Sequence, residues 1–125
     1  MKNKTGIDMS LGDVIDRLTI LSRKIFFGEE GAYQEHTALS KGIDKLNIPL
    51  TGALLACIIR ISQMNFEVWN RENGFRRGED MDAEAVRQMM IEVRDFNSKR
   101  VEHKNEINRQ TEMGWREFKV QHRSR

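Results

Sequence analysis

Apolar side chains recur every three or four residues along most of this chain, and this spacing constrains the fold more than any other feature. The clearest stripe comprises Leu50, Leu54, Cys57, Ile61, Met64 and Val68. Such spacing places side chains on one face of an α-helix, whereas strands require strict alternation. A single proline among 125 residues leaves room for long helices. The sequence therefore predicts an all-α protein.

Two helices are expected in the first half of the chain. The first begins after Ser10, a typical N-cap residue with an acid three positions later at Asp13, and it ends near Gly28. A shorter helix is expected from about Glu30 to Leu46, before a turn at Pro49. Its apolar seam is expected to comprise Tyr33, His36, Leu39, Ile43 and Leu46.

Two longer helices are expected in the second half. The stripe that starts at Leu50 widens to more than half of the helix circumference, and Gly74 marks its expected end. Such a helix is typically central and surrounded by partners, so we expect this one to be the central element. The fourth helix is expected to be capped by Asp82 and to run to about Met113.

The assembled prediction is an up-down helical bundle of three long helices and one short helix, in a single domain over residues 1–125. Residues 1–9 are expected to form a loose N-terminal arm, and residues 114–125 an extended C-terminal arm packed on the bundle. Large aromatic side chains, such as Trp69 and Phe75, exceed what a slim bundle hides, which favours a homodimer.

Composition and charge placement indicate the cellular compartment in which the chain is expected. Cys57 is the single cysteine, so a disulfide framework is excluded. Charges stand near the N-terminus where a signal peptide needs apolar residues, and the longest uncharged run, from Leu46 to Ile59, is too short to cross a bilayer. We therefore expect a cytoplasmic protein with no membrane partner. A net charge of +2, mixed along the chain, gives little support to nucleic-acid binding.

The second half of the fourth helix departs from an apolar pattern. Asn97, Arg100 and Lys104 recur at three or four residues and share one face with Asn108. Buried amide and guanidinium groups need partners, which the first helix and residues such as Asn65 offer. The first helix also carries an i,i+4 pair of opposite charge. The candidate ligand-binding residues are Asp13, Asp16, Arg17, Asn97, Arg100, Lys104 and Asn108.

Two interpretations of this polar face stay open. It can be an ionic network that fixes the register between helices. Alternatively it can bind an anionic small molecule or a partner protein, and a binding module of this kind is the leading functional hypothesis. No metal site is predicted, because the histidines lack neighbours at metal-ligand spacing.

Enzymatic alternatives rest on analogy with two classes of small helical bundle. In bundles of the chorismate mutase type, Arg and Lys side chains grip a dicarboxylate, and Arg17, Arg100 and Lys104 fit those roles. In all-α nucleotide pyrophosphohydrolases, acid pairs hold Mg²⁺; here such pairs stand at Asp13 with Asp16 and at Glu92 with Asp95. Neither pattern is a motif match, so no catalytic residue is assigned and no cofactor is predicted outside the Mg²⁺-dependent alternative.

A third alternative is nucleic-acid binding through the C-terminal arm. From Arg109 to Arg125 the chain carries five Lys and Arg residues against two Glu. A basic tail can grip phosphates, although such tails are more often simply solvated.

Two segments resemble a group of small bacterial helical proteins. These share an LGxxIDxLTIL opening and an NxxRxxxKxxIN pattern near the C-terminus. The matching residues here are Leu11, Gly12, Ile15, Asp16, Leu18, Thr19, Ile20, Leu21, Asn97, Arg100, Lys104, Ile107 and Asn108. No activity is established for that group, so the resemblance implies a shared site built on Asp16 and the polar face, without implying a reaction.

Overall fold

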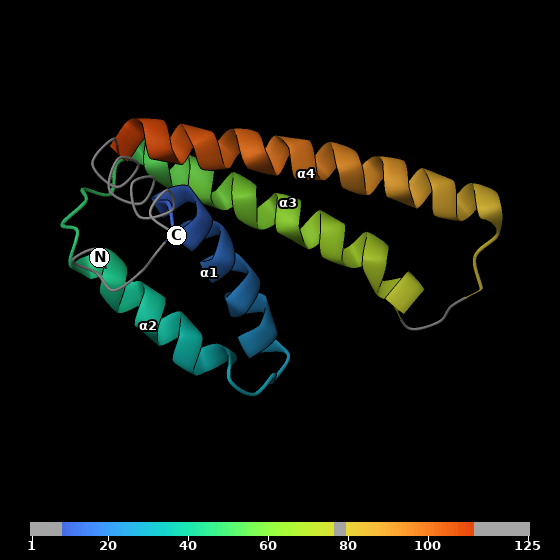
Figure 1. Ribbon diagram of the computed structural model, residues 1–125, viewed down its shortest axis with the longest axis horizontal. Helices are drawn as coiled ribbons and strands as arrows, with labels where there is room; N and C mark the ends of the chain where they lie inside the picture. Colours follow the sequence, from blue (N-terminus) through green and yellow to red (C-terminus); the bar gives the residue numbers. More distant parts are fainter. Residues whose placement is uncertain (1–8, 77–79, 112–125) are drawn as a thin grey trace.

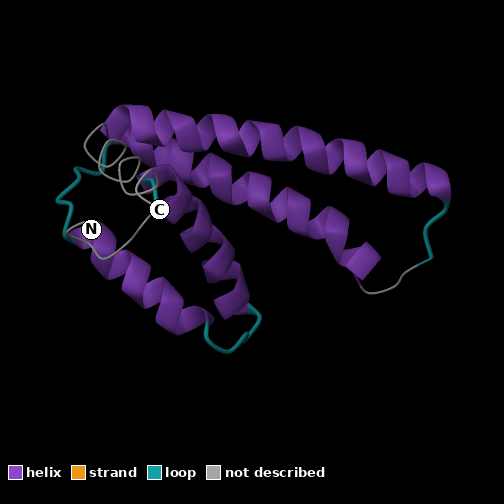
Figure 2. Cartoon of the chain, in the orientation of Figure 1, coloured by secondary structure: helices purple, strands orange, loops and turns teal. Residues whose placement is uncertain are grey.

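The computed structural model describes residues 9–76 and 80–111, and within them it contains four helices and no strand (Figures 1 and 2). These are α1 (Leu11–Phe26), α2 (Ala32–Asp44), α3 (Gly52–Arg76) and α4 (Ala83–Thr111). The predicted all-α helical bundle is confirmed. The C-terminal arm predicted for residues 114–125, the expected helix end at Met113 and most of the N-terminal arm lie outside the described residues.

The helix starts follow from local capping. The Ser10 hydroxyl accepts a hydrogen bond from the Asp13 amide at 3.1 Å, and Asp82 Oδ1 accepts one from the Ala85 amide at 2.7 Å. Each bond satisfies one of the amide groups that an α-helix leaves unpaired at its N-terminus. At the end of α1, Gly28 adopts a φ of +76°, a left-handed conformation that glycine reaches without strain.

The helices form two hairpins that meet through α1. Helix α2 packs against α1, and α1 packs against both α3 and α4, which form the long second hairpin. Within the described helices, no Cα atom of α2 lies within 8 Å of a Cα atom of α3 or α4. Figure 1 shows that the far halves of α3 and α4 extend well beyond α1. As a result, one half of the long hairpin is a three-helix junction and the other is a two-helix pair.

The apolar core lies at the junction of α1, α3 and α4. Its most deeply buried side chains are those of Leu11, Val14, Leu21, Ile61 and Ile107. The second helix adds Leu39 at one edge, and Met9 packs against the same cluster. Because these residues come from both ends of the sequence, the core ties the start of the chain to the last described helix.

Several details differ from the predicted pattern. Tyr33 is 67% exposed, and Ala32 is buried in its place at the start of α2. Helix α3 is not surrounded by partners: Leu50 before it and Ile59 within it are exposed, because α2 packs on α1 and leaves this side of α3 uncovered. Helix α3 also continues through Gly74 to Arg76.

The prediction had three long helices and one short helix, whereas the observed helices fall into two short ones and two long ones. Helices α1 and α2 have 16 and 13 residues, whereas α3 and α4 have 25 and 29. Among the described residues, none of the helices combines the length and the apolar character needed to cross a bilayer.

Candidate functional site

Helices α1 and α4 approach each other closely at Gly12. A Cβ atom built on Gly12 would lie 2.4 Å from the Lys104 carbonyl oxygen, well inside van der Waals contact. Glycine therefore lets the two backbones touch at this crossing. The Gly12 amide, one of the first unpaired amides of α1, donates to Asn108 Oδ1 at 2.7 Å. This bond explains why Asn108, only 3% exposed, is stable in the core.

Next to this contact, Asp16 is held by residues from two other helices. Asp16 as a whole is 7% exposed, and its carboxylate accepts a hydrogen bond from Asn65 Nδ2 at 2.8 Å. The guanidinium of Arg100 lies with its Nε 3.4 Å from Asp16 Oδ1, and its Nη1 donates to Asn65 Oδ1 at 3.1 Å. Asn65 Nδ2 also donates to Thr19 Oγ1 at 2.8 Å. Asn65 thus joins the acid of α1 to the base of α4.

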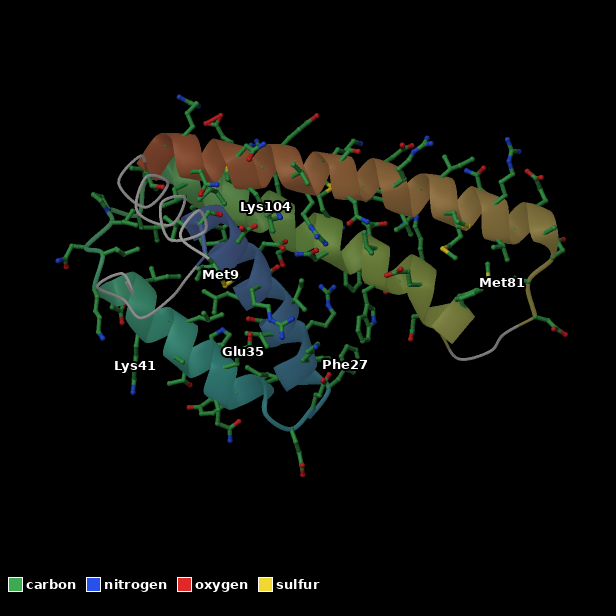
Figure 3. The ribbon with its side chains drawn as sticks, viewed as in Figure 1. Met9, Phe27, Glu35, Lys41, Met81 and Lys104 are labelled. Carbon is green, nitrogen blue, oxygen red and sulfur yellow. The ribbon has the colours of Figure 1, made fainter. Side chains whose placement is uncertain are left out.

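A second ion pair lies at the edge of the crossing. Lys104 Nζ is 3.0 Å from Asp13 Oδ1, and Figure 3 labels Lys104 where α4 passes the start of α1. Two carboxylates of α1 therefore face two cations of α4, and the arrangement is neutral. We call these residues the crossing cluster: Gly12, Asp13, Asp16, Thr19, Asn65, Arg100, Lys104 and Asn108.

The structure gathers five of the seven residues predicted for the site. Asp13, Asp16, Arg100, Lys104 and Asn108 all belong to the crossing cluster. These five residues come from α1 and α4.

The other two predicted residues lie elsewhere. Arg17 donates from Nε and Nη2 to the carboxylate of Glu35 on α2, at 2.8 and 2.9 Å, in place of the expected pair with Asp13. Asn97 lies one turn before Arg100, and among the described residues its buried Oδ1 has no hydrogen-bond donor. Arg100 Nε is also without an acceptor in hydrogen-bond geometry.

Sequence reasoning gave too little weight to Asn65. This residue follows Cys57 and Ile61 at intervals of four and falls on the buried stripe of α3, where it is 7% exposed. An amide on an apolar stripe is a detectable signal of a buried polar contact. By contrast, nothing in the sequence identifies Glu35 as the partner of Arg17, because the two lie on different helices.

The Arg17–Glu35 pair gives a prediction about pH. The hydrogen bond from Arg17 lowers the pKa of Glu35, so the pair stabilises the folded chain above the unfolded pKa, and this contribution disappears as the pH falls through the folded pKa. Both side chains are partly exposed, so we expect Arg17→Met to lose about 0.5 kcal/mol at neutral pH. Urea denaturation should show the loss shrinking as the pH falls below the ordinary pKa of a glutamate, and vanishing once the Glu35 carboxylate is protonated in the folded chain.

The matched control for this pair is Arg94→Met, which removes an exposed contact with Asp95 within α4. It should change the free energy of unfolding by less than about 0.5 kcal/mol at either pH. A loss in Arg17→Met that stays constant down to low pH would contradict the proposed role of the Glu35 carboxylate.

The acid pairs named for a Mg²⁺ site do not converge. Asp13 and Asp16 are each bonded to a cation of α4, and Glu92 accepts from Arg71 Nε at 2.9 Å. A hydrogen bond from Gln88 and, to a smaller extent, one from Arg71 lower the pKa of Glu92. Within residues 9–76 and 80–111, no three His, Cys, Asp or Glu side chains are arranged to hold a metal ion.

A groove opens beside the crossing cluster, on the two-helix part of the long hairpin. We call it the distal groove; it has a volume of about 820 Å³. Its lining is mainly apolar and comprises Phe75, Val86, Met89, Met90, Val93 and Val101, with Glu72, Arg94, Asn97 and Ser98 as polar groups. Met90 is 62% exposed, which is unusual for an apolar side chain at a helical seam position.

No protein-family model, curated protein or solved structure matches this chain. Its function has to be inferred from the crossing cluster and the distal groove.

Proposed function

We propose that this protein is a helical binding module whose distal groove holds an amphipathic helix of a partner protein. The observation that carries the proposal is the groove itself, an apolar channel left open where α3 and α4 extend beyond α1. Large exposed apolar patches on a folded protein mark interaction sites. A cytoplasmic location is part of this proposal.

The dimensions of the groove favour a helix as its occupant. On α4 the lining extends from Val86 to Val101, which corresponds to about 22 Å at 1.5 Å per residue, or four helical turns. An amphipathic helix can lay its apolar face into such a channel, with anchors at helical spacing. Met89 and Met90 add flexible, polarizable side chains that adapt to different partners.

One polar group in the groove also favours a bound helix as the occupant. Asn97 is part of the lining, and its buried Oδ1 has no donor among the described residues. Buried acceptors are normally satisfied. A hydroxyl, amide or ammonium group on the bound helix would satisfy Asn97 and set the register of that helix along the channel.

The crossing cluster has a supporting role in this proposal. Its ion pairs hold α1 against α4, and the hydrogen bonds of Asn65 add α3, so the cluster fixes the edge at which the groove begins. Binding of an anionic small molecule receives less support, because Arg100 and Lys104 already face Asp16 and Asp13. A homodimer that formed through the distal groove would place a helix of a second copy there.

The test uses a labelled, idealised amphipathic peptide of about 16 residues, matched to the length of the groove. We expect saturable binding by fluorescence anisotropy, and no binding of a scrambled peptide with the same composition. Met90→Glu should weaken binding roughly tenfold or more, because it places a charge on the apolar contact surface. Ile59→Glu is the matched control, since Ile59 is similarly exposed but lies outside the groove.

Two outcomes would contradict the proposal. The first is peptide binding that Met90→Glu leaves unchanged. The second is a chain that sediments as a dimer, fails to bind any peptide and becomes monomeric in Met90→Glu, which would assign the groove to a second copy.

A further inference from the structure

We propose that this chain forms a homodimer in which an exposed face of α3 packs antiparallel against the same face of a second copy. Leu55, Ile59, Ser62 and Phe66 follow one another at intervals of four and three along α3, so they share one side of the helix. We call these four residues the α3 strip. The strip shares no residue with the lining of the distal groove, so this dimer does not depend on the function proposed above.

The α3 strip is mainly apolar and exposed. Leu55 is 44% exposed, Ile59 60% and Phe66 41%, because α1 and α4 cover other sides of α3. Intervals of four and three are the spacing by which one helix packs along another at a shallow angle. The buried seam of α3 already packs in the core, so this second seam indicates that a further helix covers it.

Aromatic side chains at the end of α1 enlarge this surface. Phe27 stacks on Trp69 of α3 with ring centroids 6.0 Å apart, and Phe26 packs edge-on against Phe27 (Figure 3). At about 150–200 Å² for a large side chain, the exposed parts of Phe26, Phe27, Leu50 and the strip amount to roughly 600 Å² per copy. An interface of standard size buries about 800 Å² per partner, so this surface supplies most of what a stable dimer needs.

A groove beside the strip can receive an aromatic side chain of the second copy. We call it the inner groove; it lies between α1, α2 and α3, has a volume of about 610 Å³, and includes Ile58, Ile59 and Ser62 in its lining. If the two-fold axis passes beside Ser62, a residue four positions after Ser62 lies opposite one four positions before it. Phe66 of one copy therefore lies opposite Ile58 of the other, where it enters the inner groove.

The residues nearest the proposed axis carry no charge. Beside a two-fold axis each side chain faces the same side chain of the other copy, so a charged residue there would meet a like charge. Ser62 and its exposed neighbour Gln63 are both uncharged. This part of α3 is therefore compatible with self-association.

Opposite charges border the parts of the surface that meet in this dimer. The guanidinium of Arg23 lies over the ring of Phe66, with its Cζ 4.4 Å from the ring centroid, and Asp44 lines the inner groove. Within residues 9–76 and 80–111 neither Arg23 nor Asp44 belongs to an ion pair. Because the axis places Phe66 of one copy at the inner groove of the other, it brings each Arg23 toward Asp44 of the other copy.

The first experiment measures the mass of the full-length chain by sedimentation equilibrium. We expect twice the mass of one chain at micromolar concentration. Phe66→Glu should raise the dimer dissociation constant roughly tenfold or more, because a carboxylate loses its hydration in the inner groove. Met90→Glu is the matched control, since it places the same charge on an exposed position of the distal groove, and it should leave the mass unchanged. Far-UV circular dichroism checks that both variants keep their helices.

The second experiment tests the symmetry by charge reversal. Arg23→Glu and Asp44→Lys should each raise the dissociation constant roughly tenfold, since each turns two favourable pairs into repulsive ones. An equimolar mixture of the two variants should recover dimers, because both pairs then combine opposite charges. Four outcomes overturn the proposal: a monomeric full-length chain, a dimer that Phe66→Glu leaves intact, a dimer that Met90→Glu dissociates, or a mixture that associates no more tightly than its components.

Discussion

Replacing Gly12 with alanine is expected to lower the free energy of unfolding by about 2 kcal/mol. Alanine is normally the better helix former by about 1 kcal/mol, so a local effect alone would raise stability. Here the new methyl group meets the Lys104 carbonyl oxygen at 2.4 Å, and backbone cannot move aside as a flexible side chain can. Forcing two packed helices apart costs about 3 kcal/mol, which exceeds the gain in propensity.

The same substitution should also weaken the bond between the Gly12 amide and Asn108, because separation of α1 from α4 lengthens it. Urea denaturation measures the loss. The control is Gly52→Ala at the start of α3, where an added Cβ meets nothing within 4 Å, and it should leave stability unchanged or raise it slightly. Equal effects at Gly12 and Gly52 would mean that the close crossing of α1 and α4 is absent in solution.

Asp16→Leu is expected to produce the largest loss, about 3 kcal/mol, with a fall in Tm of roughly 10 °C. The substitution keeps the number and branching of the side-chain heavy atoms but leaves the guanidinium of Arg100 without its counter-ion in a mostly buried position. It also removes one acceptor from Asn65. Because Arg100 retains some contact with solvent, the loss should lie at the lower end of the range for broken buried pairs.

A double-mutant cycle measures the interaction free energy between Asp16 and Arg100 apart from their contacts with other residues. Arg100→Met alone should cost a similar amount, since it leaves the Asp16 carboxylate buried with Asn65 as its remaining partner across the interface. Combining both substitutions replaces the ion pair with apolar side chains, so the double mutant should recover to within about 1 kcal/mol of the parent chain. Additive losses would contradict a direct interaction between Asp16 and Arg100.

Sequence patterns predicted the residues that are fixed by local chemistry. The start of α1 at Ser10 and the start of α4 after Asp82 follow from capping within one helical turn. The polar face of α4 was also predictable, because the spacing of Asn97, Arg100 and Lys104 places them together on any helix.

Properties that depend on which helices meet were not predictable in the same way. Periodicity identifies the apolar face of α3 but says nothing about what covers it, and the expectation of a fully surrounded helix was wrong for this reason. Arg17 has two acids within reach along the sequence, yet it bonds to Glu35 on another helix. The exposure of α3 and the partner of Arg17 both depend on where α2 packs, and this is set by tertiary contacts and not by local spacing.

The bond between Gly12 and Asn108 joins residues that are 96 positions apart, and this separation affects how the chain can fold during its synthesis. At 5 to 20 residues per second, the ribosome needs about 5 to 20 s to make the intervening segment. Until then the first helix carries an acid, an open amide and an apolar stripe that have no α4 to receive them. The nascent chain therefore depends on α4 to complete the burial of α1. A pause in translation before Asn108 would prolong the interval in which these groups are exposed to chaperones and to aggregation.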